Sequence, residues 1–238
     1  CRAAGAYLYV DATATLGGME IAADRWGADI VSGGLQKCLG GPAGSAPITI
    51  SDRAAERIFS RRHVEQGIAR DDLQKGSGRR IASNYFDLAM IMDYWSEKRL
   101  NHHTEATTML YGARECARVA LEEGLPARFA RHAKAGAAVT AGLRAMGLKV
   151  FGDDSHRMTN VTGVWIPEGV DGERVRTRMR EDFEIEIGTS FGPLQGRIWR
   201  IGTMGFNARK PAVLQVLGAL EAVLLRHRAK VARGEAVQ

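Results

Sequence analysis

Cysteine is scarce in this chain of 238 residues, which contains only Cys1, Cys38 and Cys116. Three scattered cysteines are too few for a disulfide framework or a tetrahedral zinc site. No run approaches the roughly 18 apolar residues of a membrane-spanning helix, and the first residues lack a charged start that leads into an apolar stretch. These absences exclude a disulfide-stapled miniprotein and predict a soluble intracellular protein.

Basic residues are in excess, but they are dispersed. The formal net charge is +6, and the densest basic cluster (Arg57, Arg61 and Arg62) has no interleaved aromatic residue. A solvated basic surface, or attraction for small anions, is therefore expected in place of nucleic-acid binding. The adjacent His102 and His103 would point apart on a regular element, and the other histidines are isolated, so no metal site is predicted.

Apolar residues make up 45% of the chain and charged residues 25%, which is typical of a globular protein. Strand-like apolar runs at 7–10, 28–32 and 46–50 alternate with polar and helix-forming stretches. Apolar residues then recur at steps of three and four between 84 and 123, which predicts two helices. The polar stretch 67–80 is expected to be an exposed loop. The pattern indicates an α/β fold.

The sequence EEGLP at 122–126 is a helix stop, because glycine follows the last periodic residue and proline comes directly after. We therefore divide the chain into domains at 1–123 and 124–238. The second domain is predicted to contain helices at 127–146, 172–183 and 211–228. Strands are expected at 148–151, 161–166, 184–187 and 197–201, which gives an α+β pattern.

One acid and one amine stand out in the first domain. Asp11 ends an apolar strand and Lys37 follows another, so both are expected in one crevice at the carboxyl ends of the strands, and Thr13 would share the face of Asp11. A lysine beside apolar strands and glycines can be partly desolvated and can form a Schiff base. A lysine paired with an acid that could hold a pyridinium nitrogen is used with pyridoxal phosphate. Residue types alone favour the alternative, in which Asp11 caps a turn and Lys37 is a surface lysine.

The order of the motifs resembles one family. VDA, GGMEIAADRWGAD, SGGLQK and LGGPAG closely resemble class V pyridoxal-phosphate aminotransferases, which include the alanine, serine and ureidoglycine–glyoxylate aminotransferases. The likeness continues through SNYFDL, RLNHHTEATTMLYGARE and RIWRIGTMGFNARK, so it covers essentially the whole chain. It implies a fold type I α/β protein, in which this chain looks like the latter part of the mixed-sheet large domain plus an α+β small domain.

The resemblance also implies a set of cofactor contacts. Lys37 would bond covalently to pyridoxal 5'-phosphate, and Asp11 would contact the pyridine nitrogen. Gln36 and Thr13 would lie in the cofactor shell. Thr104 resembles the residue that reaches the cofactor phosphate of the neighbouring subunit, which implies a homodimer with shared sites. A separate amino-terminal partner segment is a further expectation, since longer members of the family supply the rest of the cofactor site.

Two residues are expected to bind substrate. Arg200 resembles the clamp for the substrate carboxylate, although a structural ion pair is an alternative. The stretch LQKCLGGPAGSAP and Asn101 in NHHT are most similar to the ureidoglycine–glyoxylate branch of the family. An asparagine amide suits a ureido substrate, because it can both donate to and accept from a ureido group. Asn101 could instead cap the following helix.

The expected reaction is therefore transfer of an amino group from (S)-ureidoglycine to glyoxylate in purine catabolism, giving glycine and an oxo acid. The alternatives are an alanine or serine donor, or a noncatalytic remnant that cannot hold cofactor. The final residues GEAVQ lack a peroxisomal tripeptide. The cytoplasm is therefore the expected compartment.

Overall fold

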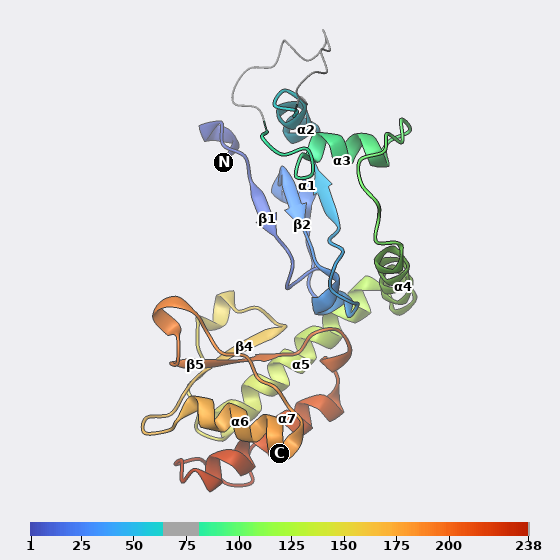
Figure 1. Cartoon of the computed structure of the whole chain (residues 1–238). Coiled ribbons are helices and arrows are strands. Elements are labelled where there is room, and N and C mark those ends of the chain that lie inside the picture. The colour runs from blue at the N-terminus through green and yellow to red at the C-terminus, as the bar shows by residue number, and fades with distance from the viewer. Residues whose placement is uncertain (64–80, 238) are drawn as a thin grey trace.

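The computed structural model describes residues 1–63 and 81–237, which form an upper and a lower unit joined by long helices (Figure 1). The loop expected at 67–80 lies outside the described residues. Among the helices of the described ranges, none is both long and apolar enough to cross a membrane.

A small mixed sheet forms the centre of the upper unit. Strands β1 (Tyr9–Asp11) and β2 (Ile30–Ser32) are parallel, and β3 (Ile48–Ile50) pairs with β2 in the antiparallel direction. All three strands lie within or beside the predicted runs. The register places Asp11 opposite Ser32 at the carboxyl ends of the parallel pair. The upper unit also contains the short helices α1 (Ala23–Trp26), α2 (Asp52–Phe59) and α3 (Leu88–Trp95).

A buried acid fastens this sheet to α2. Asp29 is 1% exposed and lies just before β2. Its carboxylate accepts hydrogen bonds from Arg53 Nε at 2.9 Å and from the Leu8 backbone at 2.8 Å. These two contacts hold the pKa of Asp29 well below its usual range. Because Leu8 precedes β1, the same carboxylate fixes the starts of both parallel strands.

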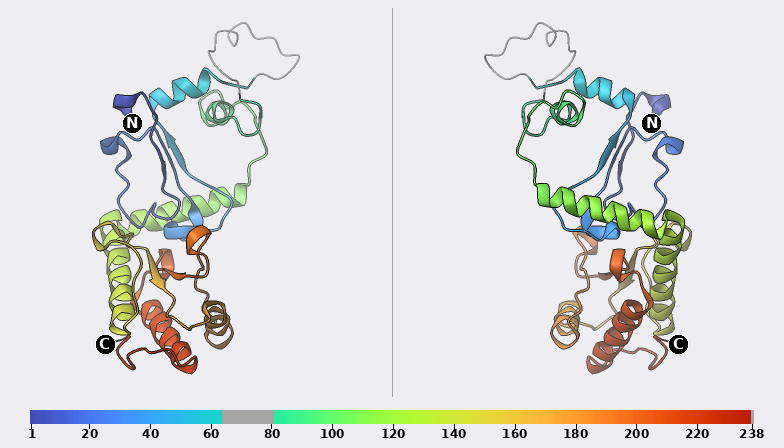
Figure 2. Two further views of the ribbon diagram at one scale, coloured as in Figure 1. Left: turned by 90° about the vertical axis from the view of Figure 1, so that its left-hand side faces the viewer. Right: turned by 90° about the vertical axis from the view of Figure 1, so that its right-hand side faces the viewer.

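Two long helices connect the units. Helix α4 (Thr107–Glu123) lies across the junction, and α5 (Leu125–Ala145) runs down into the lower unit (Figure 2). Gly124 separates them with a φ of 81°, a conformation that glycine adopts easily. Helix α5 begins two residues before the prediction because Pro126 is tolerated in a first helical turn. We infer that the domain boundary lies at this break.

The lower unit packs three helices against a two-stranded antiparallel sheet. Strands β4 (Val161–Trp165) and β5 (Ile198–Gly202) pair along their whole length. Helices α5, α6 (Gly172–Phe183) and α7 (Lys210–Arg226) contribute most of the core. Its fully buried side chains include Leu143, Val164, Met179, Trp199 and Leu220.

Two of the predicted strands are wrong. The stretch 148–151 is reduced to one bridge between Val150 and Val164, because the chain turns away at Gly152, where φ is 92°. The stretch 184–187 is not a strand, and its neighbour Gly188 makes one bridge to Arg200. Ile187 is nevertheless buried. The apolar residues of 184–187 therefore indicate packing in the core and not strand pairing.

Gly136 of α5 offers a test of the packing in the lower unit. A Cβ there would lie 1.8 Å from the Thr159 carbonyl oxygen. We expect Gly136→Ala to lower the free energy of unfolding by about 1–3 kcal/mol, as overpacking does. A Cβ on Gly218 of α7 would have no atom within 4 Å outside the neighbouring backbone of its own helix. Gly218→Ala should therefore stabilise the protein by up to about 1 kcal/mol. Urea unfolding measures both, and equal effects would contradict the packing.

Candidate functional site

Asp11 stands at the carboxyl end of β1 with its side chain exposed. Its Oδ1 accepts a hydrogen bond from the Thr13 backbone nitrogen at 2.8 Å. Hydrogen bonds from the Thr13 side chain and backbone lower the pKa of Asp11 from its ordinary value. The carboxylate is therefore ionised near neutral pH.

Gly34 lies between two of the other expected cofactor residues. A Cβ on Gly34 would be 2.8 Å from Gln36 Oε1 and 2.9 Å from Thr13 Cγ2. Glycine is thus the residue that allows Thr13 and Gln36 to approach each other. Because Thr13 also bonds to Asp11, the structure brings these three predicted residues to one edge of the sheet.

Lys37 lies in a short π-helical turn, η2 (Leu35–Leu39), that follows β2. Its backbone departs from the helix, with φ −111° and ψ −120°, and Gly40 ends the turn with a φ of 80°. The side chain is exposed, so the expected partial desolvation is not present in this chain. Within the described residues, no acid or carbonyl bonds to its amine. Lys37 Nζ is thus accessible from solvent.

Cys38 and Asn160 connect the segment after Asp11 to the segment after Lys37. The Cys38 thiol donates to the Ala14 carbonyl at 3.2 Å, and Asn160 Nδ2 contacts both that carbonyl and Cys38 Sγ. Burial raises the pKa of the Cys38 thiol, so it serves as a neutral packing group. Asn160 was not predicted from the sequence, because an isolated asparagine before a strand resembles an ordinary loop residue.

Arg200 lies in β5 between Gly163 of β4 and Gly188, and its side chain is exposed. Its Nε donates to the Thr189 carbonyl at 2.5 Å, and its guanidinium carbon lies 5.1 Å from the centre of the Phe191 ring. No acid pairs with Arg200 in the described ranges, so the structural ion pair considered as an alternative is absent there. Its two terminal nitrogens face no described acceptor and can form a planar fork.

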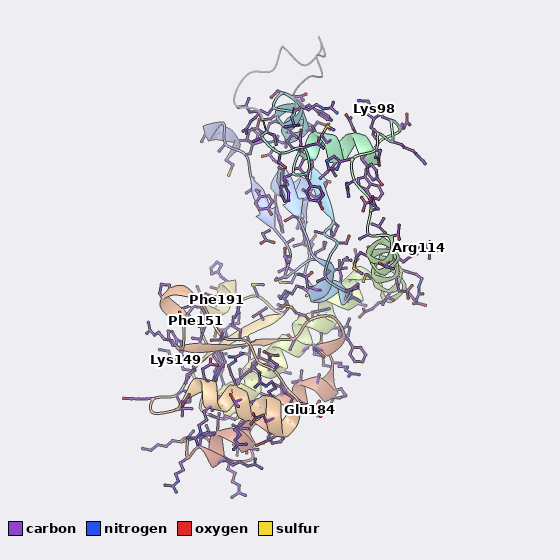
Figure 3. The ribbon with its side chains drawn as sticks, in the orientation of Figure 1. Lys98, Arg114, Lys149, Phe151, Glu184 and Phe191 are labelled. Carbon is purple, nitrogen blue, oxygen red and sulfur yellow. The ribbon has the colours of Figure 1, made fainter. Side chains whose placement is uncertain are left out.

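A cavity of about 410 Å³ opens beside this fork. Phe151 and Phe191 belong to its lining, and both lie at the same side of the lower unit as β4 and β5 (Figure 3). Ser190 and His156 add polar groups to the lining. Arg200 therefore lies where an anionic group could enter from solvent.

Asn101 and Thr104 are exposed on the connection between α3 and α4. Helix α4 begins at Thr107 with Ala106 at its cap position, so the alternative that Asn101 caps this helix is wrong. His102 bonds to the Asn84 carbonyl at 2.7 Å and thereby fixes the connection. No hydrogen bond in the described part of the chain joins Asn101 or Thr104 to the Lys37 turn. Their roles stay predictions.

The groups at the sheet edge suit a pyridine cofactor that carries an aldehyde. Lys37 offers a reactive amine, Asp11 an ionised carboxylate, Thr13 a hydroxyl and Gln36 an amide. An amine can bond to an aldehyde, and a carboxylate favours positive charge on a ring nitrogen. The donor set therefore fits pyridoxal phosphate.

Relatives of known structure match the chain in sequence and in fold. A crystal structure of the ureidoglycine–glyoxylate aminotransferase from Bacillus subtilis superposes with a TM-score of 0.88 at 54% identity, over 100% of this chain and 57% of that one. Alanine–glyoxylate aminotransferase from Nostoc superposes with a TM-score of 0.83 at 37% identity, over 94% of this chain and 55% of that one. The predicted α/β fold of type I aminotransferases is thereby confirmed.

Curated sequences give the same result. The (S)-ureidoglycine–glyoxylate transaminase of Bacillus subtilis is 56% identical over 240 residues, covering 100% of this chain and 58% of that protein. Alanine–glyoxylate aminotransferase of Drosophila melanogaster is 34% identical over 92% of this chain and 53% of its own length. The chain thus spans a little over half the length of these relatives. The profile of Aminotransferase class-V matches residues 1–193. The chain belongs to the class-V aminotransferase family, whose cofactor is pyridoxal phosphate.

Proposed function

We propose that this chain carries the lysine and the carboxylate clamp of an enzyme that transfers an amino group from (S)-ureidoglycine to glyoxylate. The observation that carries the proposal is the edge of the first sheet, where ionised Asp11 and exposed Lys37 accompany Thr13 and Gln36, whose side chains both lie beside Gly34. The 56% identity to the Bacillus subtilis (S)-ureidoglycine–glyoxylate transaminase supports the choice of substrates. Alanine or serine as the donor is the second candidate, favoured by the alanine–glyoxylate relatives.

When bound, pyridoxal phosphate supplies an aldehyde that receives the amino group and a ring that draws electrons from the α carbon. Asp11 would hold positive charge on the ring nitrogen, since its own pKa is lowered and it keeps its negative charge. Lys37 would tether the cofactor through Nζ and, once displaced by substrate, move a proton at that atom as base and then as acid. Thr13 and Gln36 would orient the bound group.

Arg200 would bind the substrate carboxylate through its two terminal nitrogens. The Thr189 carbonyl holds Nε at 2.5 Å and thereby fixes the plane of the guanidinium. A fixed plane favours two-point binding of a carboxylate, which sets the orientation of the α carbon. Glyoxylate and amino acids both carry this carboxylate, so one clamp would serve both halves of the exchange.

Asn101 would recognise the ureido group of the donor, and Thr104 would contact the cofactor phosphate of a neighbouring subunit. Both side chains are exposed in a single chain. Exposure of this kind suits residues that complete a site in a homodimer. We infer that such a dimer, in the cytoplasm, is the active form.

Replacing Lys37 tests the covalent role. We expect Lys37→Ala to remove the cofactor absorbance that borohydride reduction bleaches, and to lower the rate about 10²–10⁴-fold, because the general base is lost. Lys134→Ala, which removes an exposed lysine of α5, is the control and should keep both properties. A borohydride-sensitive cofactor in Lys37→Ala would disprove the assignment.

Replacing Arg200 tests the clamp. Arg200→Lys should raise KM for glyoxylate about 10–100-fold, because an ammonium cannot reproduce a two-point contact. The matched control is Arg197→Lys, since Arg197 lies over the Trp165 ring at 5.2 Å in the same region. Steady-state kinetics with both variants provide the measurement. Unchanged kinetics of Arg200→Lys would refute the clamp.

Replacing Asn101 tests the donor. Asn101→Tyr should reduce kcat/KM for ureidoglycine more than kcat/KM for alanine, because tyrosine cannot both donate to and accept from a ureido group as an amide does. The ratio of the two values, measured with glyoxylate as acceptor, is the readout. Equal losses would remove the reason for preferring the ureido donor.

A further inference from the structure

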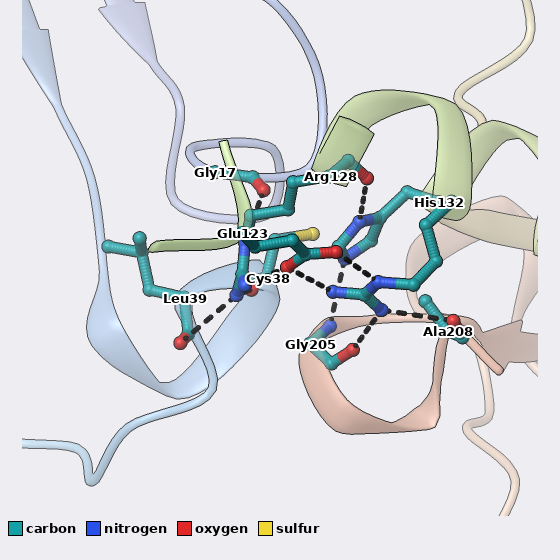
Figure 4. A network of polar contacts seen from close by, with 9 residues as sticks. Gly17, Cys38, Leu39, Glu123, Arg128, His132, Gly205 and Ala208 are labelled. Carbon is teal, nitrogen blue, oxygen red and sulfur yellow. Dashed lines mark hydrogen bonds and ion pairs between the residues drawn. The ribbon is translucent and has the colours of Figure 1, made fainter. Parts of the chain in front are cut away.

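The turn that carries Lys37 is held by contacts to its main chain. Arg128 of α5 donates from Nη2 to the Cys38 carbonyl at 2.7 Å and to the Leu39 carbonyl at 3.4 Å. Its Nε donates to the Gly17 carbonyl at 2.9 Å. Arg128 itself is 3% exposed. One buried guanidinium therefore joins the turn after Lys37 to the loop that follows Asp11 (Figure 4).

Glu123 fixes the direction of this guanidinium. Its Oε2 accepts a hydrogen bond from Arg128 Nη1 at 2.6 Å, and its Oε1 accepts one from Arg131 Nε at 2.5 Å. Hydrogen bonds from Arg131 and Arg128 lower the pKa of Glu123 to about 2, against the opposing effect of burial. The carboxylate thus stays ionised and holds two arginines in defined positions.

Arg131 extends the contacts toward the strand of Arg200. Its Nη1 donates to the Gly205 carbonyl at 2.8 Å and to the Ala208 carbonyl at 3.0 Å, which are the first residue of the 3₁₀ turn η6 (Gly205–Asn207) and the residue that follows it. The Gly205 nitrogen donates to His132 Nε2 at 3.0 Å. Gly205 follows β5, so these contacts fix the end of the strand that carries Arg200.

The Lys37 turn and the η6 turn, which these contacts join, also touch each other directly. A Cβ on Gly205 would lie 3.1 Å from the Lys37 carbonyl oxygen and 3.1 Å from Gly40 Cα. The positive φ of 55° at Gly205 is a second reason for glycine there. The η6 turn therefore packs directly on the main chain of the Lys37 turn.

We propose that Arg128, oriented by Glu123, is a positioning residue that sets where Lys37 lies relative to Asp11 and Arg200. Arg128 is buried and bonds to the carbonyls of Gly17, Cys38 and Leu39, so it acts on Lys37 through the main chain. Because a displacement of about 1 Å at a reacting group can cost about 100-fold in rate, a looser turn should slow proton transfer. The role in catalysis rests on the proposed function.

The test compares Arg128→Met with Arg118→Met in the cofactor-loaded protein. Arg118 also pairs with two acids, Glu115 and Glu122, but it is half exposed on α4. We expect Arg128→Met to lower kcat about 10–100-fold with less than a threefold change in KM. The visible circular dichroism of the lysine-bound cofactor should change as well. Arg118→Met should leave all three unchanged.

Two further measurements separate positioning from stability. Hydrogen exchange at residues 35–41, measured without cofactor, should be at least tenfold faster in Arg128→Met than in the parent chain. Glu123→Gln keeps the shape of the side chain and removes its charge, so it should give the same spectral change if Arg128→Met does not fold. Arg128→Lys should restore less than half of the parental kcat, because the three donors of one compact ammonium cannot replace a guanidinium that bonds to three carbonyls and to Glu123.

The outcomes are distinct. A folded Arg128→Met with parental kcat, dichroism and exchange would overturn the proposal. If that variant does not fold, parental values for Glu123→Gln would do the same. Absence of lysine-bound cofactor from the parent protein would instead refute the proposed function. In that case faster exchange at 35–41 would still support the positioning role, and parental exchange would overturn it.

Discussion

The carboxylate of Glu123 is the contact on which the arrangement of the two units depends. It lies at the end of α4, and both of its arginine partners lie on α5. One arginine bonds to carbonyls of the upper unit, and the other bonds to carbonyls of the lower unit. Two guanidinium groups against one carboxylate leave one positive charge, which the five carbonyls around them solvate. Water would otherwise have to supply that solvation.

This contact has a definite pH range. The pKa of Glu123 is lowered to about 2 in the folded chain, whereas a free glutamate has a pKa of about 4.3. A group with a lowered pKa stabilises the fold above its unfolded value and loses that contribution as the pH falls toward the folded value. The link between the units is therefore complete near neutral pH and weakens below about pH 4.

The positions of the main elements followed from periodicity and helix signals. The break at Gly124 and the helices around it were predicted because glycine and proline act locally. The strands predicted at 148–151 and 184–187 failed, because pairing depends on a partner strand elsewhere in the chain. Within the candidate site, Asp11 and Lys37 were predicted from their place after apolar strands, and each follows a strand of the parallel pair. Their joint role stays a prediction.

The positioning residues were not found from the sequence, because arginines in an alanine-rich helix resemble a solvated face. A signal was present. Arg131 and His132 follow Arg128 by three and four residues, which places them on the same side of α5 as Arg128. Burial of Arg128 and His132 identifies this side as an interface. Only tertiary contacts distinguish a buried interface from a solvated helix face, and local sequence patterns do not contain those contacts.

The partners of the two arginines are main-chain oxygens at Gly17, Cys38, Leu39, Gly205 and Ala208. A main-chain oxygen is present whatever side chain the residue carries. Positions 38 and 39 can therefore change identity during evolution or engineering without disturbing the guanidinium contacts, provided that the new side chains fit. The residues next to the lysine can thus vary while the framework that holds the lysine is inherited unchanged.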